Sequence, residues 1–266
     1  MTSPHPYSRL PLDYQPAKQM LKDRVILVAG ASQPHSLGRV AAMTYAAQGA
    51  TVILHGRNIP KLEAAYDEIE ALGYPQPAIM PLDFLTASQA DLDGFADTIR
   101  STLGRLDGLF HGASHFSPLT PMGLQGLEVW QQHLTVNLAV PMALTKACLP
   151  LLKRANDAAV IFLSETHAAV PTAYWGAFAT SKNALHAATE IWSAEMSEAD
   201  HVRFHVCVPG PVASPLRSKS HPGELAAGGE LGQLASSPPP PASLAPHFLY
   251  LMSTNDCPAG RLYQCT

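Results

Sequence analysis

Short, mostly apolar runs alternate along this chain with longer stretches that have helical periodicity. Most of the apolar runs end at a glycine, aspartate, serine or proline. Strands and helices that alternate at this pitch predict a parallel sheet with helices on both faces. We therefore predict an α/β fold with a single, doubly wound parallel sheet. The expected strands are residues 25–29, 51–55, 78–82, 106–110, 158–163 and 204–208, and the expected helices are residues 37–48, 61–72, 127–154 and 173–196.

The ends of the expected strands carry the residues best suited to a ligand site. Sheets of this Rossmann type bind ligands outside the carboxyl ends of their strands. Gly30, Asp83, His111, Ser164 and Pro209 each follow an expected strand. We therefore expect these five residues to face one crevice.

A length of 266 residues suits one α/β domain or two small ones. From the continuous alternation of strands and helices we expect residues 22–266 to form one Rossmann-fold domain. Residues 1–21 are polar and broken by prolines, which predicts an irregular N-terminal arm on the surface or on a partner subunit. Residues 214–241 are rich in Pro, Gly, Ser and Ala, which predicts a long mobile segment. That segment is either a lid over the crevice or a disordered surface insertion, and the sequence favours neither.

Composition argues against several other classes of protein. A net charge of −4 gives no basic surface for nucleic acid, so no nucleic-acid partner is expected. The four cysteines show no C-x-x-C spacing, and we expect no metal site. We find no run of about 18 apolar residues and no charged start followed by an apolar run, so we expect no membrane span and no secretory signal. A cytoplasmic protein is the resulting prediction.

The turn after the first expected strand runs from Gly30 to Gly38 and opens a helix. Backbone N–H groups and the helix dipole at such a turn can hold a pyrophosphate. Ser36 stands where a middle glycine is usual, and two extra residues lengthen the turn. The alternative is a strand–helix turn without a ligand.

Arg57 follows the second expected strand, at a position where an NAD-selecting enzyme usually has Asp or Glu for the ribose hydroxyls. An arginine there can pair instead with a 2′-phosphate, which favours NADP over NAD. The alternative is a solvated surface arginine.

Together these motifs resemble the short-chain dehydrogenase/reductase family over about residues 22–264. Residues 21–28 and 175–177 are similar to the YciK-type bacterial oxidoreductases, a branch of that family. The features that match the family in order and spacing are the Gly30 turn, Asp83, Asn137, Ser164, Lys182, and Pro209 and Gly210 followed by Ser214.

The resemblance implies a role for each matching residue. Asn137 would hold a water in a proton relay, Ser164 would bind the substrate carbonyl oxygen, and Lys182 would bind the nicotinamide ribose. Asp83 would contact the adenine. The implied cofactor-binding residues are Gly30, Ser32, Ser36, Leu37, Gly38, Arg57, Asp83, Phe84, Ala113, Lys182, Pro209, Gly210, Val212 and Ser214.

Phe178 is the main departure from the family pattern. It lies four residues before Lys182, where the family has the tyrosine that donates or accepts a proton. A phenylalanine side chain has no O–H group. Gly112 and Ser114 also replace the usual Asn and Gly after the fourth expected strand.

Several nearby residues have the chemistry to replace the missing tyrosine. The candidates are Tyr174, His167 and Glu165, with His115 as a weaker one. A histidine whose pKa is near neutral is a suitable acid for carbonyl reduction. For each histidine the alternative is a packed or solvated structural role.

Two functions are therefore open. The first is an NADP-dependent oxidoreductase with an atypical site, which transfers hydride to or from a carbonyl or an activated double bond of a small molecule. The second is a catalytically impaired NADP(H)-binding homologue that acts as a sensor or as a partner subunit. The family resemblance also implies a homodimer or homotetramer, packed through helices 127–154 and 173–196.

Overall fold

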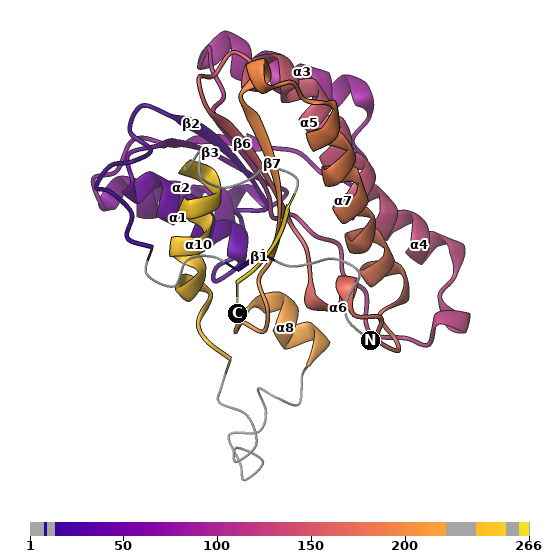
Figure 1. Cartoon of the computed structure of the whole chain (residues 1–266). Helices are drawn as coiled ribbons and strands as arrows, with labels where there is room; N and C mark the ends of the chain where they lie inside the picture. Colours follow the sequence, from indigo (N-terminus) through magenta and orange to yellow (C-terminus); the bar gives the residue numbers. More distant parts are fainter. Residues whose placement is uncertain (1–7, 10–13, 222–237, 254–260, 266) are drawn as a thin grey trace.

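All the described strands join one parallel sheet in this computed structural model, which describes residues 8–9, 14–221, 238–253 and 261–265 (Figure 1). The strand order is β1-β8-β7-β6-β5-β2-β3-β4. The predicted doubly wound α/β sheet is confirmed. Its strands are β1 (Ser8–Arg9), β2 (Val25–Ala29), β3 (Thr51–Gly56), β4 (Ala78–Pro81), β5 (Gly108–His111), β6 (Ala158–Leu163), β7 (Val202–Val208) and β8 (Arg261–Gln264).

The chain reverses its direction across the sheet between β2 and β5. Strands β2, β3 and β4 progress toward one edge, and the chain then returns to place β5 on the other side of β2. A crevice opens at such a switch point, outside the carboxyl ends of the strands. The strand order therefore fixes where a ligand site can form.

Helices cover both faces of the sheet (Figure 1). Within β2, Ile26 and Val28 belong to the core beneath α1, α2 and α10, whereas Leu27 belongs to the core beneath α3, α5 and α7. This alternation follows from the two-residue period of a strand. The helices with their bounds are α1 (Leu37–Ala47), α2 (Ile59–Ala71), α3 (Gln89–Thr102), α4 (Leu127–Leu134), α5 (Val140–Leu152), α6 (Thr166–Ala169), α7 (Gly176–Glu195), α8 (Pro215–Ser220) and α10 (Ala245–Ser253).

The long helix expected over residues 127–154 is one continuous run with a π-helical turn inside it. This turn spans Thr135–Ala139, and Val140 N–H donates to the carbonyl of Thr135. Such turns are frequent at functional sites. The turn contains Asn137, and it ends α4 before α5 begins.

By length and composition, the run Leu127–Leu152 could cross a membrane. In this fold α4 packs on α7, α5 packs on α3, and Leu144 and Cys148 of α5 lie in the core. Packing against α3, α7 and the core therefore accounts for the apolar side chains of this run that are buried.

The ends of the chain contain elements that the sequence patterns did not predict. Strand β8 pairs with β7 and with β1, so Ser8–Arg9 of the expected irregular arm extends the sheet. Helices α3 and α10 were also not predicted. Most of the expected lid over residues 214–241 lies outside the described residues, but α8 forms at its start.

Asp157 joins three segments at the amino ends of the strands, opposite the crevice. Its carboxylate accepts hydrogen bonds from Arg24 Nη2 at 2.7 Å and from Arg203 Nη2 at 2.8 Å. The same guanidinium groups donate to the carbonyls of Leu251 and Met252 near the end of α10.

Replacing Asp157 with alanine should lower the free energy of unfolding by about 1.5–3 kcal/mol, the range for a hydrogen bond to a charged group. The loss would leave two largely buried guanidinium groups without their carboxylate. Urea denaturation measures this change. Asp97→Ala removes an exposed pair with Arg100 and should have little effect. Equal effects of the two substitutions would contradict a structural role for Asp157.

Candidate active site

A cavity of about 620 Å³, here called the main cavity, opens at the carboxyl ends of the strands. It lies at the switch point between β2 and β5. The sequence-predicted residues that line it are Gly30, Ser32, Ser36, Leu37, Arg57, Asp83, Phe84, Ala113, Ser164, Phe178, Lys182 and Ser214.

Other predicted residues, Pro209 of the expected crevice among them, do not line the main cavity. Val212 is buried in the core, and Pro209 and Gly210 form the turn after β7, where Gly210 has a φ of +70°. The expectation for His111 is wrong, because its ring points into the helical layer. Its Nε2 lies 2.8 Å from Thr145 Oγ1, and the ring stacks on Phe162.

Backbone segments approach very closely at the glycine turn. A Cβ on Gly30, which has a φ of +92°, would lie 2.5 Å from the backbone nitrogen of Ala113. A Cβ on Gly38 would lie 2.3 Å from the carbonyl oxygen of Gly30. Ser36 Oγ caps α1 by accepting from Arg39 N–H at 3.1 Å. The first N–H groups of α1 therefore face the main cavity. The turn beside them has no room for a side chain at Gly30 or at Gly38.

Arg57 and Asp83 line the main cavity after β3 and β4, whereas Lys182 lines it from α7. Arg57 Nη1 lies 3.7 Å from Asp83 Oδ2, and the arginine side chain is 68% exposed. An exposed pair of this kind contributes little to stability. Phe84 is buried beside them and stacks on His55. The guanidinium is therefore available to an anionic ligand.

Asn137 is buried and uses its whole amide group within the protein. Its Nδ2 donates to the His115 carbonyl at 3.1 Å and to Ser181 Oγ at 3.0 Å. Its Oδ1 accepts from His115 N–H at 2.8 Å and from Ser114 Oγ at 3.3 Å. The π-helical turn thus ties the loop after β5 to α7.

Lys182 is buried on α7, and its Nζ donates to the Leu163 carbonyl at 2.9 Å. Burial lowers the pKa of Lys182 to about 8, although the nearby Glu165 opposes the shift. Burial also raises the pKa of Glu165, against the effects of its bond to Thr166 N–H and of Lys182 and Arg217.

Ser164 directly follows β6 and has a partner that the sequence motifs did not indicate. Its Oγ lies 2.7 Å from Nε2 of His186, a buried residue of α7. The spacing of His186 after Lys182 was an available signal, because residues four apart share a helix face. Ser164, Lys182 and His186 therefore form one group at the base of the main cavity.

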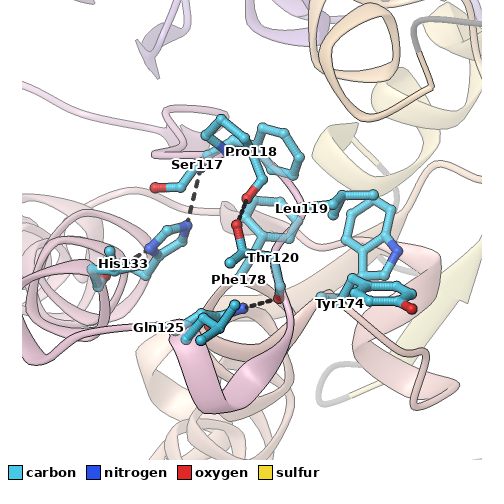
Figure 2. A pocket seen from close by; sticks show the side chains of 12 residues that line it. Ser117, Pro118, Leu119, Thr120, Gln125, His133, Tyr174 and Phe178 are labelled. Carbon is cyan, nitrogen blue, oxygen red and sulfur yellow. Dashed lines mark hydrogen bonds between the residues drawn. The ribbon is translucent and has the colours of Figure 1, made fainter.

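Phe178 and Phe116 line both the main cavity and a second cavity of about 280 Å³, here called the side cavity. Figure 2 shows the side cavity, with Phe178 at its back and His133, Gln125 and Tyr174 around it. The ring of Phe178 meets that of Phe116 edge-on at 5.1 Å. Phe178 is thus part of an aromatic wall and offers no proton.

Three of the candidate replacements for the tyrosine do not line the main cavity. Tyr174 is 55% exposed, has a φ of +75° and lines the side cavity. His167 Nδ1 bonds Thr172 Oγ1, and its ring stacks on Trp175. Glu165 caps α6 by accepting from Thr166 N–H. Of the four candidates, His115 lines the main cavity, and burial lowers its pKa, with a smaller effect of His133.

Residues 24–225 match the family model described as short chain dehydrogenase. The chain is 35% identical over 241 residues to the uncharacterized oxidoreductase YciK of Escherichia coli, covering 91% of this chain and 90% of that protein. A solved structure described as a short chain dehydrogenase from Pseudomonas syringae has a TM-score of 0.87 at 33% identity, covering 96% of this chain and 99% of that chain. Another, from Shigella flexneri and complexed with NADP, has a TM-score of 0.84 at 32% identity, covering 93% and 99%.

A similar structure from Escherichia coli, complexed with NADPH, has a TM-score of 0.84 at 34% identity. The match covers 94% of this chain and 99% of that chain. The likeness therefore extends over nearly the whole chain in each of these structures.

The lowered pKa of Lys182 gives a pH-dependent contribution to stability. Between about pH 8 and the ordinary lysine pKa of 10.5, the unfolded chain binds more protons at this residue than the folded one. Stability from Lys182 therefore rises with pH across that window. Relative to Lys182→Met, wild type should gain on the order of 3 kcal/mol of unfolding free energy between pH 7.5 and 10.5, measured by urea denaturation.

The matched control for this prediction is Lys18→Met, which removes an exposed lysine. Its difference from wild type should stay constant over the same pH range. A constant difference for Lys182→Met as well would mean that the buried lysine keeps an ordinary pKa.

Proposed function

Because this chain belongs to the short-chain dehydrogenase/reductase family, we propose that it is an NADP(H)-dependent oxidoreductase with an atypical active site. Its reaction would transfer hydride to or from a carbonyl group or an activated double bond of a small molecule. The observation that carries this proposal is the presence of the glycine turn, Ser164 and Lys182 around one cavity.

The residues of the main cavity fit a dinucleotide. The absent side chains of Gly30 and Gly38 leave room for close backbone approach at the start of α1, where a pyrophosphate is favoured. Arg57 would hold a 2′-phosphate, and Lys182 would hold a ribose. The similar Shigella and Escherichia coli structures, with NADP and NADPH, support this choice of cofactor. When bound, the nicotinamide supplies or accepts the hydride.

The chain's own residues would orient the substrate and manage its proton. Ser164 Oγ, at the base of the main cavity, would hydrogen-bond the substrate oxygen. Lys182, with a pKa of about 8, carries a positive charge at neutral pH and favours negative charge on that oxygen. Phe178 would exclude water from the site and hold an apolar part of the substrate.

The absence of a hydroxyl at Phe178 favours the second function, that of a catalytically impaired NADP(H)-binding protein. Without a general acid or base, a site of this kind typically loses about 10²–10⁴-fold in rate. Tight cofactor binding without turnover would then point to a sensor or a partner subunit. We favour the enzyme because orientation alone can lower a barrier by about 7–11 kcal/mol.

We also propose a homodimer or homotetramer. Leu124 and Leu127, at the start of the α4 region, are 75% and 73% exposed. Apolar side chains that lie together on a surface are typical of subunit contacts.

The glycine turn gives the test of cofactor binding. Wild type should bind NADPH about tenfold or more tightly than NADH, and Gly38→Ala should weaken NADPH binding by about tenfold, which corresponds to 1.4 kcal/mol. The added Cβ would push the Gly30 carbonyl out of place. Nicotinamide fluorescence measures both constants.

Gly94→Ala is the matched control, because Gly94 lies on α3 with open space around the position of a Cβ. It should bind NADPH as wild type does. If wild type binds neither NADPH nor NADH at millimolar concentration, both proposed functions are contradicted, because each requires a bound nicotinamide cofactor.

Phe178→Tyr should raise kcat for the reduction of 9,10-phenanthrenequinone with NADPH, by about tenfold or more if the new hydroxyl supplies the proton. Absorbance of NADPH follows the reaction. Phe116→Tyr places the same hydroxyl on the neighbouring ring and should give no comparable gain. Unchanged kcat in Phe178→Tyr, together with tight NADPH binding, would show that a missing phenol does not limit the site.

A further inference from the structure

Ser164 and His186 form a buried hydrogen-bonded pair at the base of the main cavity. They are 4% and 1% exposed, and Ser164 Oγ lies 2.7 Å from His186 Nε2. Ser164 comes from the end of β6 and His186 from the middle of α7, so the packing of the helix on the sheet brings them together. Of the two, Ser164 lines the main cavity and His186 lies behind it.

The geometry is that of a hydroxyl activated by an imidazole. A nucleophile or acid and its base usually stand about 2.6–3.2 Å apart, and this pair is within that range. Ser164 Oγ also donates to the Lys182 carbonyl oxygen at 3.5 Å, and a carbonyl oxygen can only accept. The imidazole is therefore the partner that can exchange a proton with Ser164.

Other groups near the site are committed elsewhere. The Asn137 amide has protein partners on both of its polar atoms. Lys182 Nζ donates to the Leu163 carbonyl. Tyr174 lines the side cavity, behind the aromatic wall. The Ser164–His186 pair thus combines a hydroxyl in the main cavity with a group that can take up or release its proton.

We propose that His186 is a positioning residue that relays the proton of the reaction through Ser164. This rests on the proposed function. The pair would perform the proton transfer that Phe178 cannot perform, because its side chain has no O–H group. The proton would leave the substrate on the β6 side of the cavity.

The proton transfers balance in either direction. In alcohol oxidation, Ser164 Oγ takes the hydroxyl proton of the substrate while His186 Nε2 takes the proton of Ser164. The hydrogen on the substrate carbon leaves with its electron pair to the oxidised nicotinamide, and the C–O bond becomes double. Once the product has left, His186 Nε2 returns its proton through Ser164 Oγ to water in the main cavity, which Ser164 lines. Reduction follows the same path in reverse, with reduced nicotinamide as the reductant.

The first measurement uses protein without cofactor. In ¹⁵N-labelled wild type, the Nε2 resonance of His186 should report a hydrogen bond, and Ser164→Ala should shift that resonance. Thr189→Val is the control, since Thr189 Oγ1 donates to the Leu185 carbonyl in the same helix. It should leave the His186 resonance in place. An unchanged resonance in Ser164→Ala means that the pair does not form and overturns the inference.

The second measurement separates a proton relay from a packing role. The amide of His186→Gln can still hydrogen-bond Ser164 but does not titrate. With NADPH and 9,10-phenanthrenequinone, its kcat should fall by about tenfold or more, as for the loss of a general acid, while KM and the NADPH Kd stay within about threefold. Thr189→Val should keep the wild-type kcat. Added imidazole should restore part of the kcat of His186→Ala.

The outcomes distinguish this inference from the proposed function. A wild-type kcat in His186→Gln overturns the relay while leaving the oxidoreductase intact. Equal loss of kcat in Ser164→Ala, His186→Gln and the double variant supports the relay, because the effects of substituting residues that act as a unit are not additive. If wild type binds NADPH but reduces no ketone, quinone or enone, the proposed function fails and the relay fails with it.

Discussion

The close backbone packing at Gly30 is the constraint on which the site depends. Gly30 N–H donates to the His55 carbonyl at 3.0 Å, which joins the end of β2 to the end of β3. On the other side, a Cβ at Gly30 would collide with Ala113, just after β5. Three strand ends and the start of α1 therefore meet at one residue. The main cavity is the space that this junction leaves open.

Helix α7 supplies the second part of the site. Phe178, Ser181, Lys182, His186 and Thr189 are all buried. Phe178, Lys182, His186 and Thr189 follow one another at three or four residues, which places them on one face, and Ser181 lies next to Lys182 at the edge of that face. Ser181 is bonded to Asn137 in the π-helical turn, and His186 is bonded to Ser164 at the end of β6. The helix thus holds its lysine against two other elements, and a single phenylalanine on the same face removes the usual hydroxyl without disturbing that packing.

The electrostatics of this face follow from burial. Burial in an apolar interior lowers the pKa of a lysine, because the charged form loses its contact with water. Lys182 keeps a pKa of about 8 because Glu165 partly offsets the cost of burial. The group therefore remains a cation at neutral pH. A buried cation beside a serine hydroxyl suits a reaction in which negative charge develops on a substrate oxygen.

The sequence by itself determined the α/β class, the positions of the central strands and a set of residues that line the main cavity. These features depend on local periodicity and on the residues at strand ends, such as Gly30, Asp83 and Ser164, which can be recognised along the chain. It also indicated that Phe178 lacks a proton to give. The order of the strands, the pairing of β1 with β8 and the inward turn of His111 could not be predicted in this way. The tertiary structure alone decided that Tyr174 faces the side cavity and that His186 meets Ser164. The reason is that each of these contacts joins segments far apart in sequence, and its geometry depends on how a helix seats on the sheet rather than on any local pattern.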